Sequence, residues 1–254
     1  LRYNERIRID SEDVDDASLV ASFERIEAAR GELLLTYFEF GTLAAIDLIA
    51  RSGVEVAVLE VGLGGRLDAV NIIDADVAIV TSVDLDHQEW LGGDRDTIGR
   101  EKAYIGRAGR PLVLGEANPP ERLLETARQI GANVLMAGTH FGDAPGTPSM
   151  AGDFQGSNAA AAVAALRALT ALKVDDAAVR AGLAAARVPG RLQVLPGHPA
   201  VVVDVGHNPH AARALAAWLD EAPRGRVQAV FGALADKDID GVMNALGRRI
   251  DRWH

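Results

Sequence analysis

The length, composition and charge of the chain narrow the classes of protein to which it can belong. Its 254 residues are 48% hydrophobic and 24% charged, which is ordinary for a globular protein that buries one large or two modest cores. A formal net charge of −10 argues against a protein that wraps a nucleic-acid backbone. The absence of cysteine excludes disulfides and thiolate metal sites, and no apolar run approaches the roughly twenty residues of a membrane span. We therefore expect a cytoplasmic protein with no nucleic-acid or membrane partner.

The first half of the chain alternates between short apolar runs and longer stretches of helical periodicity. The runs predict strands at residues 2–9, 54–61, 76–83, 111–116 and 133–138, and the helical stretches predict helices at 18–30, 38–53, 94–109 and 119–131. The strand at 54–61 is rich in β-branched residues and is predicted to be buried on both faces. This alternation is typical of a parallel sheet covered by helices.

The second half repeats the pattern after an interruption. Residues 137–152 contain Gly, Pro and Ser and predict a loop, and two Ala-rich helices that should form core follow at 155–171 and 175–187. The stretch "VPGRLQ" at 188–193 marks a boundary, after which strands are predicted at 200–206 and 226–232 and helices at 211–222 and 239–250. We predict an α/β protein with domains at 1–187 and 188–254. Because the chain has no initiator Met and begins within a predicted strand, we expect it to be a piece of a longer protein.

Two candidate sites follow predicted strands, at the edge where open α/β sheets bind ligands. Glu60 ends the strand at 54–61 and precedes the glycine-rich stretch "GLGGRLD", although a capped tight turn would explain this pattern equally well. Asp84, Asp86 and His87 follow the strand at 76–83. Carboxylates hold Mg²⁺ together with phosphate oxygens, whereas imidazole is an unusual Mg²⁺ ligand and a lone His is more often structural.

Two further places carry polar residues with an open interpretation. Lys102 lies on a predicted helix beside an acidic residue and would ordinarily be a solvated charge. Asp204, His207 and Asn208 follow the strand at 200–206 where a helix begins. The free N–H groups of a helix start attract anions such as phosphate, although capping alone explains Asn208 before a proline.

The order of these motifs resembles a known family. The chain contains, in sequence, "RYNERIRI", "TYFEFGTL", "LEVGLGGRLDAVN", "TSVDLDHQEWLG", "IGREKA", "PGRLQ", "DVGHNPHAA" and "FGALADKDI". This series resembles the bacterial dihydrofolate synthase/folylpolyglutamate synthase family of the Mur ligase superfamily, over the whole chain except residues 137–152. The resemblance implies a P-loop-NTPase-like central domain with a parallel sheet and flanking helices, followed by a Rossmann-like C-terminal domain. It further implies an ATP-dependent amide ligase that joins L-glutamate to dihydropteroate, to reduced folates or to both, through an acyl phosphate.

The resemblance also assigns roles to residues. Glu60 and His87 match ligands of Mg²⁺ ions, for which the family has two sites, and Lys102 matches a lysine that is carbamylated. The pteroate pocket is matched by Thr36, Tyr37, Phe38, Glu39, Leu67, Asp68 and Ala69. Contacts to ATP are matched by Asn158, Arg191 and Asp204, with His207 in the same segment. Lys102, Arg191 and His207 are the candidate catalytic residues, and Arg191 is a candidate for stabilising the transferring phosphoryl group.

Departures from the family limit these expectations. The phosphate-binding G-x-x-x-x-G-K-[ST] loop does not occur in the sequence and would lie upstream of Leu1. Tyr104 and Val205 stand where the family has smaller residues. We therefore expect the chain as given to be inactive and the parent to be a monomeric ligase. The alternatives are a cell-wall Mur ligase and a non-catalytic folate- or nucleotide-binding remnant.

Overall fold

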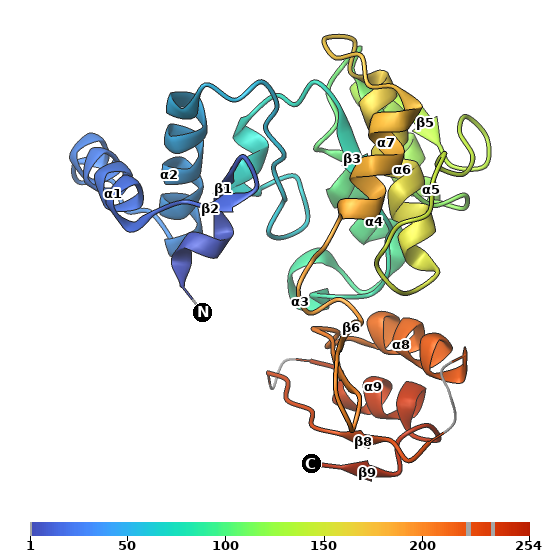
Figure 1. The fold of residues 1–254 in the computed structure, drawn as a ribbon. Helices are drawn as coiled ribbons and strands as arrows, with labels where there is room; N and C mark the ends of the chain where they lie inside the picture. The colour runs from blue at the N-terminus through green and yellow to red at the C-terminus, as the bar shows by residue number, and fades with distance from the viewer. Residues whose placement is uncertain (1, 222–224, 235–236) are drawn as a thin grey trace. The chain divides into compact units, whose positions relative to one another are not determined.

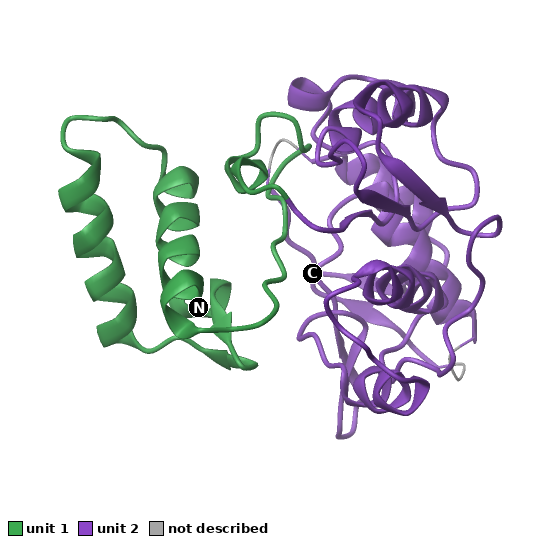
Figure 2. Ribbon diagram, turned by 90° about the horizontal axis from the view of Figure 1, so that it is seen from above, with its two compact units in different colours: residues 1–74 green, residues 75–254 purple. Residues whose placement is uncertain are grey.

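The computed structural model describes residues 2–221, 225–234 and 237–254, which form two compact units. The first unit comprises residues 1–74 and the second residues 75–254 (Figure 2). In the second unit, strands and helices alternate along the chain as expected from the sequence (Figure 1). The C-terminal residue of the helix predicted at 211–222 lies outside the described residues.

The first unit is built on two helices. Its elements are η1 (Tyr3–Arg6), β1 (Arg8–Ile9), β2 (Glu12–Asp13), α1 (Asp16–Arg30), α2 (Tyr37–Ser52) and η2 (Ala69–Ile72). The prediction of one strand over residues 2–9 is wrong, because residues 3–6 form a 3₁₀ turn and only Arg8–Ile9 pair, antiparallel with β2. The side-chain amide of Asn4 donates to the Val14 carbonyl at 2.7 Å, which draws the turn toward β2.

Local signals place α2 accurately. Thr36 and Glu39 form a capping box, in which the Glu39 N–H donates to Thr36 Oγ1 at 3.2 Å and the Thr36 N–H donates to Glu39 Oε2 at 2.7 Å. At the other end Gly53 adopts the left-handed conformation, with φ of 71°, that commonly ends a helix. The predicted helix at 38–53 is therefore confirmed.

A buried polar clamp joins α1 to α2. Ser22 is fully buried on α1, and its hydroxyl contacts the Ala44 carbonyl at 3.1 Å and Asp47 Oδ2 at 2.8 Å. Arg25 Nε also donates to Asp47 Oδ2, at 3.0 Å, and Arg51 Nε donates to Asp47 Oδ1 at 2.7 Å. One carboxylate thus accepts from both helices.

The prediction of a buried strand at 54–61 is wrong. The segment forms no strand and pairs with no other strand among the described residues, and the Val58 side chain is 91% exposed. β-Branched residues favour a strand only where a neighbouring strand supplies hydrogen bonds and packing. Glu60 is consequently exposed on an irregular segment rather than at the end of a sheet strand.

The second unit contains a three-stranded parallel sheet in the order β3-β4-β5. Its strands are β3 (Ala78–Val80), β4 (Pro111–Leu114) and β5 (Asn133–Met136), and its helices are α3 (Gln88–Leu91), α4 (Arg95–Ala103), α5 (Glu121–Ile130), α6 (Phe154–Ala168) and α7 (Asp176–Ala185). In register, Ile79 lies opposite Val113, and Val113 opposite Leu135. The helix α4 is shorter than the predicted 94–109, because the N–H groups of residues 105 and 106 bond three residues back and tighten the chain into turns.

Alternate residues of β4 face opposite layers, as strand geometry requires. Leu112 and Leu114 pack with α4 and α5, whereas Val113 packs against the alanines of α6. All three residues are fully buried. The sheet therefore lies between two helical layers, and the α/β prediction and the core role of the helix at 155–171 are confirmed. In the second Ala-rich helix, α7, only Val179 is buried.

The C-terminal part of this unit has its own small core. Its elements are β6 (Gln193–Leu195), β7 (Val201–Val203), α8 (Pro209–Glu221), β8 (Gln228–Ala229), α9 (Ile239–Leu246) and β9 (Arg252–Trp253). The strands β8 and β9 are parallel and flank α9 in the chain. Ala212 and Ala216 of α8 pack with Val242 and Leu246 of α9. Among the described residues, none of the helices combines the length and apolarity needed to cross a bilayer.

We predict that Asp47→Ala lowers the free energy of unfolding by about 1–2 kcal/mol at neutral pH, because charge-assisted hydrogen bonds are lost. Hydrogen bonds from Arg25, and then from Arg51, hold the pKa of the Asp47 carboxyl well below its usual range. A carboxyl whose pKa is lower in the folded state stabilises the fold fully at pH values above its unfolded-state pKa of about 4. That stabilisation is lost as the pH falls below this value. Denaturant unfolding at pH 7 and pH 3 should show a smaller difference from wild type at pH 3.

The matched control is Glu27→Ala. Glu27 is also an ion-paired carboxylate, bound to Arg30 on α1, but its side chain is 58% exposed. Exposed pairs contribute little, so this variant should change unfolding far less than Asp47→Ala. Equal losses in the two variants would contradict the clamp.

Candidate functional site

The loop that follows β3 carries the first group of candidate residues. His87 is the N-cap of α3 and adopts a left-handed backbone with φ of 49°, and its side chain is partly exposed. Lys102, on α4, is largely buried, and this burial lowers the pKa of its ammonium, while the negative charge of Asp86 opposes the shift. The structure thus places Lys102 within the electrostatic range of the loop that carries His87.

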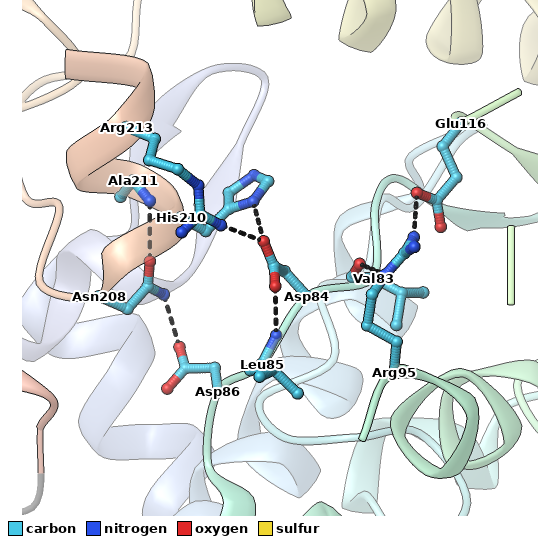
Figure 3. A network of polar contacts seen from close by, with 10 residues as sticks. All are labelled: Val83, Asp84, Leu85, Asp86, Arg95, Glu116, Asn208, His210, Ala211 and Arg213. Carbon is cyan, nitrogen blue, oxygen red and sulfur yellow. Dashed lines mark hydrogen bonds and ion pairs between the residues drawn. The ribbon is translucent and has the colours of Figure 1, made fainter. Parts of the chain in front are cut away.

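Asp84 and Asp86 connect this loop to the start of α8 (Figure 3). Asp84 Oδ2 accepts from His210 Nδ1 at 2.6 Å and from Arg213 Nη2 at 2.7 Å. Asp86 Oδ2 accepts from the Asn208 side-chain amide at 2.8 Å. Segments more than 120 residues apart in the sequence are therefore joined by five polar side chains.

Hydrogen bonding keeps both carboxylates charged. Burial alone would raise the pKa of Asp84, but the hydrogen bonds from the Leu85 N–H and His210 outweigh it and lower the pKa. For Asp86, burial again raises the pKa, and the hydrogen bonds from Asn208 and the His87 N–H outweigh it. Both groups therefore act as anions at neutral pH.

A second ion pair supports the loop from the sheet side (Figure 3). Arg95, at the start of α4, donates through Nε to the Val83 carbonyl at 2.8 Å and through Nη2 to Glu116 Oε2 at 2.8 Å. Glu116 follows the end of β4, its other oxygen is buried without a partner in the described part of the chain, and burial raises its pKa.

A cavity of about 330 Å³ lies between the loop and α8. Its charged lining residues include Asp84, Asp86, His87, His210, Arg213 and Lys237. The Lys237 ammonium lies 3.4 Å from Asp86 Oδ1, and the Lys237 side chain is only 9% exposed. Opposite charges line one hollow, which suits a ligand with both ammonium and carboxylate or phosphate groups.

The nucleotide candidates Arg191, Asp204 and His207 lie on segments that Asp204 holds together. Asp204 Oδ2 accepts from the Leu192 N–H at 2.8 Å, and Oδ1 accepts from the Gly206 N–H at 2.7 Å. His207 Nδ1 lies 3.0 Å from the Val205 carbonyl, and the Arg191 side chain is exposed. Asp204 therefore fixes the backbone next to both Arg191 and His207.

Asn158 is not drawn into this group. It is exposed on α6, and its side-chain amide donates to Gln155 Oε1 on the same helix at 3.2 Å. It makes no hydrogen bond to the other candidate residues of this unit in the described structure.

The candidate residues at the start of α2 combine structural contacts with exposure. Thr36 and Glu39 are engaged in the capping box, and the hydrogen bond from the Thr36 N–H lowers the pKa of Glu39. Tyr37 packs edge-on against Tyr3, with ring centroids 5.6 Å apart. The polar side-chain atoms of Thr36 and Glu39 are thus engaged in helix capping, whereas the Tyr37 side chain is 71% exposed.

Phe38 lies directly on the glycine-rich segment. A Cβ at Gly62 would come within 2.6 Å of Phe38 Cζ, so only glycine allows this approach. Asp68 shapes the same segment by accepting from the Leu63 N–H at 2.9 Å and from the Val70 N–H at 2.8 Å. Of the two remaining candidates, Leu67 is 92% exposed and Ala69 begins η2. The structure therefore brings Phe38 and the loop at 62–69 together within the first unit.

The predicted metal ligands fall in different units. Glu60, in the first unit, has an exposed carboxylate without a hydrogen-bond partner among the described residues, and His87 lies in the second. Across residues 2–221, 225–234 and 237–254, no three His, Cys, Asp or Glu side chains are grouped so that they could hold a metal ion.

Three residues of the polar network, His210, Arg213 and Lys237, are not singled out by the sequence. Asp84 and Asp86 are candidates as carboxylates after a strand, but nothing in the sequence pairs them with these three residues. Asn208 was open to a capping interpretation, which is confirmed by its acceptance of the Ala211 N–H at 2.9 Å, and its amide additionally binds Asp86.

Comparison with known proteins agrees with the family resemblance. The glutamate ligase domain of Mur ligases matches residues 190–254. The chain is 45% identical, over 272 aligned residues, to dihydrofolate synthase/folylpolyglutamate synthase of Escherichia coli (strain K12), covering 100% of the chain and 63% of that relative.

Two solved structures are similar over the whole chain. The structure of E. coli FolC in complex with DHPP and ADP has a TM-score of 0.94 at 43% identity, with 100% of this chain and 64% of that one covered. A bifunctional folylpolyglutamate synthase/dihydrofolate synthase with Mn, AMPPNP and L-glutamate bound has a TM-score of 0.93 at 44% identity, with 100% and 65% covered. The chain is therefore similar over its whole length to members of the dihydrofolate synthase/folylpolyglutamate synthase family of Mur ligases, and it spans somewhat less than two thirds of the length of these relatives.

Proposed function

We propose that the protein containing this chain is an ATP-dependent amide ligase that joins L-glutamate to dihydropteroate, to reduced folates or to both. The observation that carries the proposal is the similarity over the whole chain to proteins named for this activity, at 43–45% identity. The related structures contain DHPP and ADP in one case and AMPPNP, Mn and L-glutamate in the other, which supports these classes of substrate.

The chemistry explains why two substrates and a nucleotide are needed. A carboxylate is a poor electrophile, so the γ-phosphoryl group of ATP is first transferred to it to give an acyl phosphate. The glutamate amine then attacks the carbonyl carbon, the C–O bond to phosphate breaks and inorganic phosphate leaves. The protein supplies positioning and a positive charge at the transferring group.

The acceptor end is assigned to the first unit. The exposed face of Phe38 can stack on a flat pterin ring, and the close approach to Gly62 fixes the orientation of that face. Asp68 keeps the adjoining loop in place through its two backbone hydrogen bonds. Thr36, Tyr37, Glu39, Leu67 and Ala69 complete this proposed surface.

The nucleotide end is assigned to Asn158, Arg191, Asp204 and His207. Arg191 is exposed on a loop whose backbone Asp204 holds, so its guanidinium is available to a phosphate. His207 belongs to the same held segment. Exclusion of water from the site would protect the acyl phosphate from hydrolysis.

The donor groups fit a divalent cation that accompanies ATP. We assign Glu60 and His87 as ligands, with two sites in all, and the exposed Glu60 carboxylate is the hard oxygen donor that Mg²⁺ prefers. When bound, such an ion would neutralise charge on the phosphate oxygens. Burial of Lys102 favours its neutral amine, which is the form that can be carbamylated, and this modification is part of the proposal.

Four further expectations stay predictions. These are a domain boundary between residues 187 and 188, a monomer, a cytoplasmic location and the inactivity of residues 1–254 alone. A cell-wall Mur ligase and a binding remnant are the alternatives that an activity measurement separates.

The decisive experiment measures ADP release by the full-length protein with Mg-ATP and L-glutamate, with dihydropteroate or a reduced folate as the acceptor. Release with either acceptor supports the proposal, and release with both indicates a bifunctional enzyme. Release with neither, despite folded protein, contradicts it and favours a binding remnant. Release only with a nucleotide-linked peptide would identify a cell-wall ligase.

We predict that Gly62→Ala raises KM for the pterin-containing acceptor about tenfold, because the new methyl group displaces the Phe38 ring from its position. KM for ATP should stay unchanged. Initial rates of ADP release at varied acceptor and varied ATP measure both constants. Gly93→Ala is the control, because a Cβ at Gly93 meets no atom within 4 Å, and an equal effect in both variants would refute the assignment.

We predict that Arg191→Ala lowers kcat by about 100-fold or more, because a cation that faces the transferring phosphoryl group is removed. The side chain is exposed, so the melting temperature should change little. Arg128→Ala, which removes an exposed arginine at the end of α5, is the control and should keep wild-type turnover. Normal turnover in Arg191→Ala would rule out the proposed role.

A further inference from the structure

We propose that Asp84 is a positioning residue that fastens the loop after β3 to the N-terminal turn of α8. The contacts themselves are independent of the enzyme's activity, whereas their effect on turnover rests on the proposed function.

The contacts of Asp84 reach two successive exposed positions on one face of α8. Its Oδ2 accepts from His210 at 2.6 Å and from Arg213 at 2.7 Å, while its Oδ1 accepts from the Leu85 N–H at 2.7 Å. His210 and Arg213 are three residues apart, so they are neighbours on the helix surface. The Asp84 carboxylate is therefore bonded to two side chains of α8 and to one N–H group of its own loop (Figure 3).

The geometry indicates that these contacts of Asp84 stabilise the attachment of the loop to α8. The Asp84 side chain is 28% exposed, which leaves it less screened than a pair in open solvent. The hydrogen bonds to it join charged or polar donors to a carboxylate, a class that is stronger than bonds between neutral groups.

The loop is supported from its other side as well. Arg95 bonds the Val83 carbonyl and is itself held by Glu116, which anchors the residue before Asp84 to the sheet layer. Movement of α8 is therefore transmitted to a loop whose base is fixed. Asp84 is the point at which the fixed base and the helix meet.

The placement of Asp84 relates these contacts to the candidate site. Asp84 precedes His87 by three residues, and His210 follows His207 by three residues. Fastening Asp84 to His210 thus restricts the separation of two candidate site residues that belong to segments 120 residues apart. A rigid spacing of this kind lowers the cost of assembling a reactive arrangement.

The test compares wild type, Asp84→Asn, Arg213→Gln and the double variant in the full-length protein. Nitroxide labels are attached to cysteines introduced at Glu125 of α5 and Ala217 of α8, both exposed, and this chain contributes no other cysteine. The distance distribution between the labels reports how firmly α8 is held. Kinetic constants for ADP release are measured on the same proteins without labels.

The matched control is Asp220→Asn. Asp220 is also on α8 and also accepts from an arginine, Arg249, but this pair lies within the C-terminal part and does not involve the loop after β3. It controls for the loss of an ion pair from α8 itself.

We expect Asp84→Asn to broaden the distance distribution and to lower kcat about tenfold, while KM for ATP stays within about twofold. Arg213→Gln should do the same, and the double variant should be no worse than either single variant, because one interaction is removed in each case. Asp220→Asn should change neither quantity.

A distribution as narrow as wild type in Asp84→Asn would overturn the proposed fastening. Unchanged turnover in a variant whose distribution has broadened would overturn the positioning role. The distance measurement requires no turnover, so it decides whether α8 is fastened even if the proposed ligase activity is not found.

Discussion

The complete burial of residues 112–114 of β4 is the constraint on which the second unit depends. Leu112 and Leu114 face one helical layer and Val113 faces the other, so the strand is fixed in position and in register. Because its neighbours are parallel, the carboxyl ends of β3 and β4 meet at one edge of the sheet. That edge carries the loop of Asp84 and, after β4, Glu116, and Arg95 ties the two together. The polar network is thus a consequence of the apolar packing beneath it.

The contrast between β4 and residues 54–61 shows the limit of apolar patterns. Both are short runs of β-branched and aliphatic residues and both predict strands, with burial on both faces expected for residues 54–61. The strand β4 pairs with β3 on one side and with β5 on the other. By contrast, Val58 is exposed, and residues 54–61 pair with no strand in the part of the chain that the structure describes. An apolar run indicates only that a strand could be buried on both faces. Whether it is buried depends on neighbouring strands elsewhere in the chain, which the run itself does not specify.

The same distinction divides the candidate site. The capping box of Thr36 and Glu39, the left-handed Gly53 and the cap by Asn208 are local, and residues within a few positions determine them. The pairing of Asp84 with Arg213 joins residues 129 apart. No periodicity or spacing in one sequence encodes that contact, because it depends on how two separately folded segments meet. The family motifs could locate most candidate residues, Asp84 among them, but not the pairing of Asp84 with α8.

Several candidate residues have contacts that stabilise the fold at the same atoms that a ligand would use. Asp204 accepts a backbone N–H at each oxygen, and Asp68 does the same in the first unit. Such carboxylates hold loops before any ligand is present, so their first effect on binding is through the residues that those loops display. For Asp204 these are Arg191 and His207, and for Asp68 they are the exposed Leu67 and the segment beside Phe38. Ligand binding then loses little conformational entropy from these loops, because they are already ordered in the folded chain.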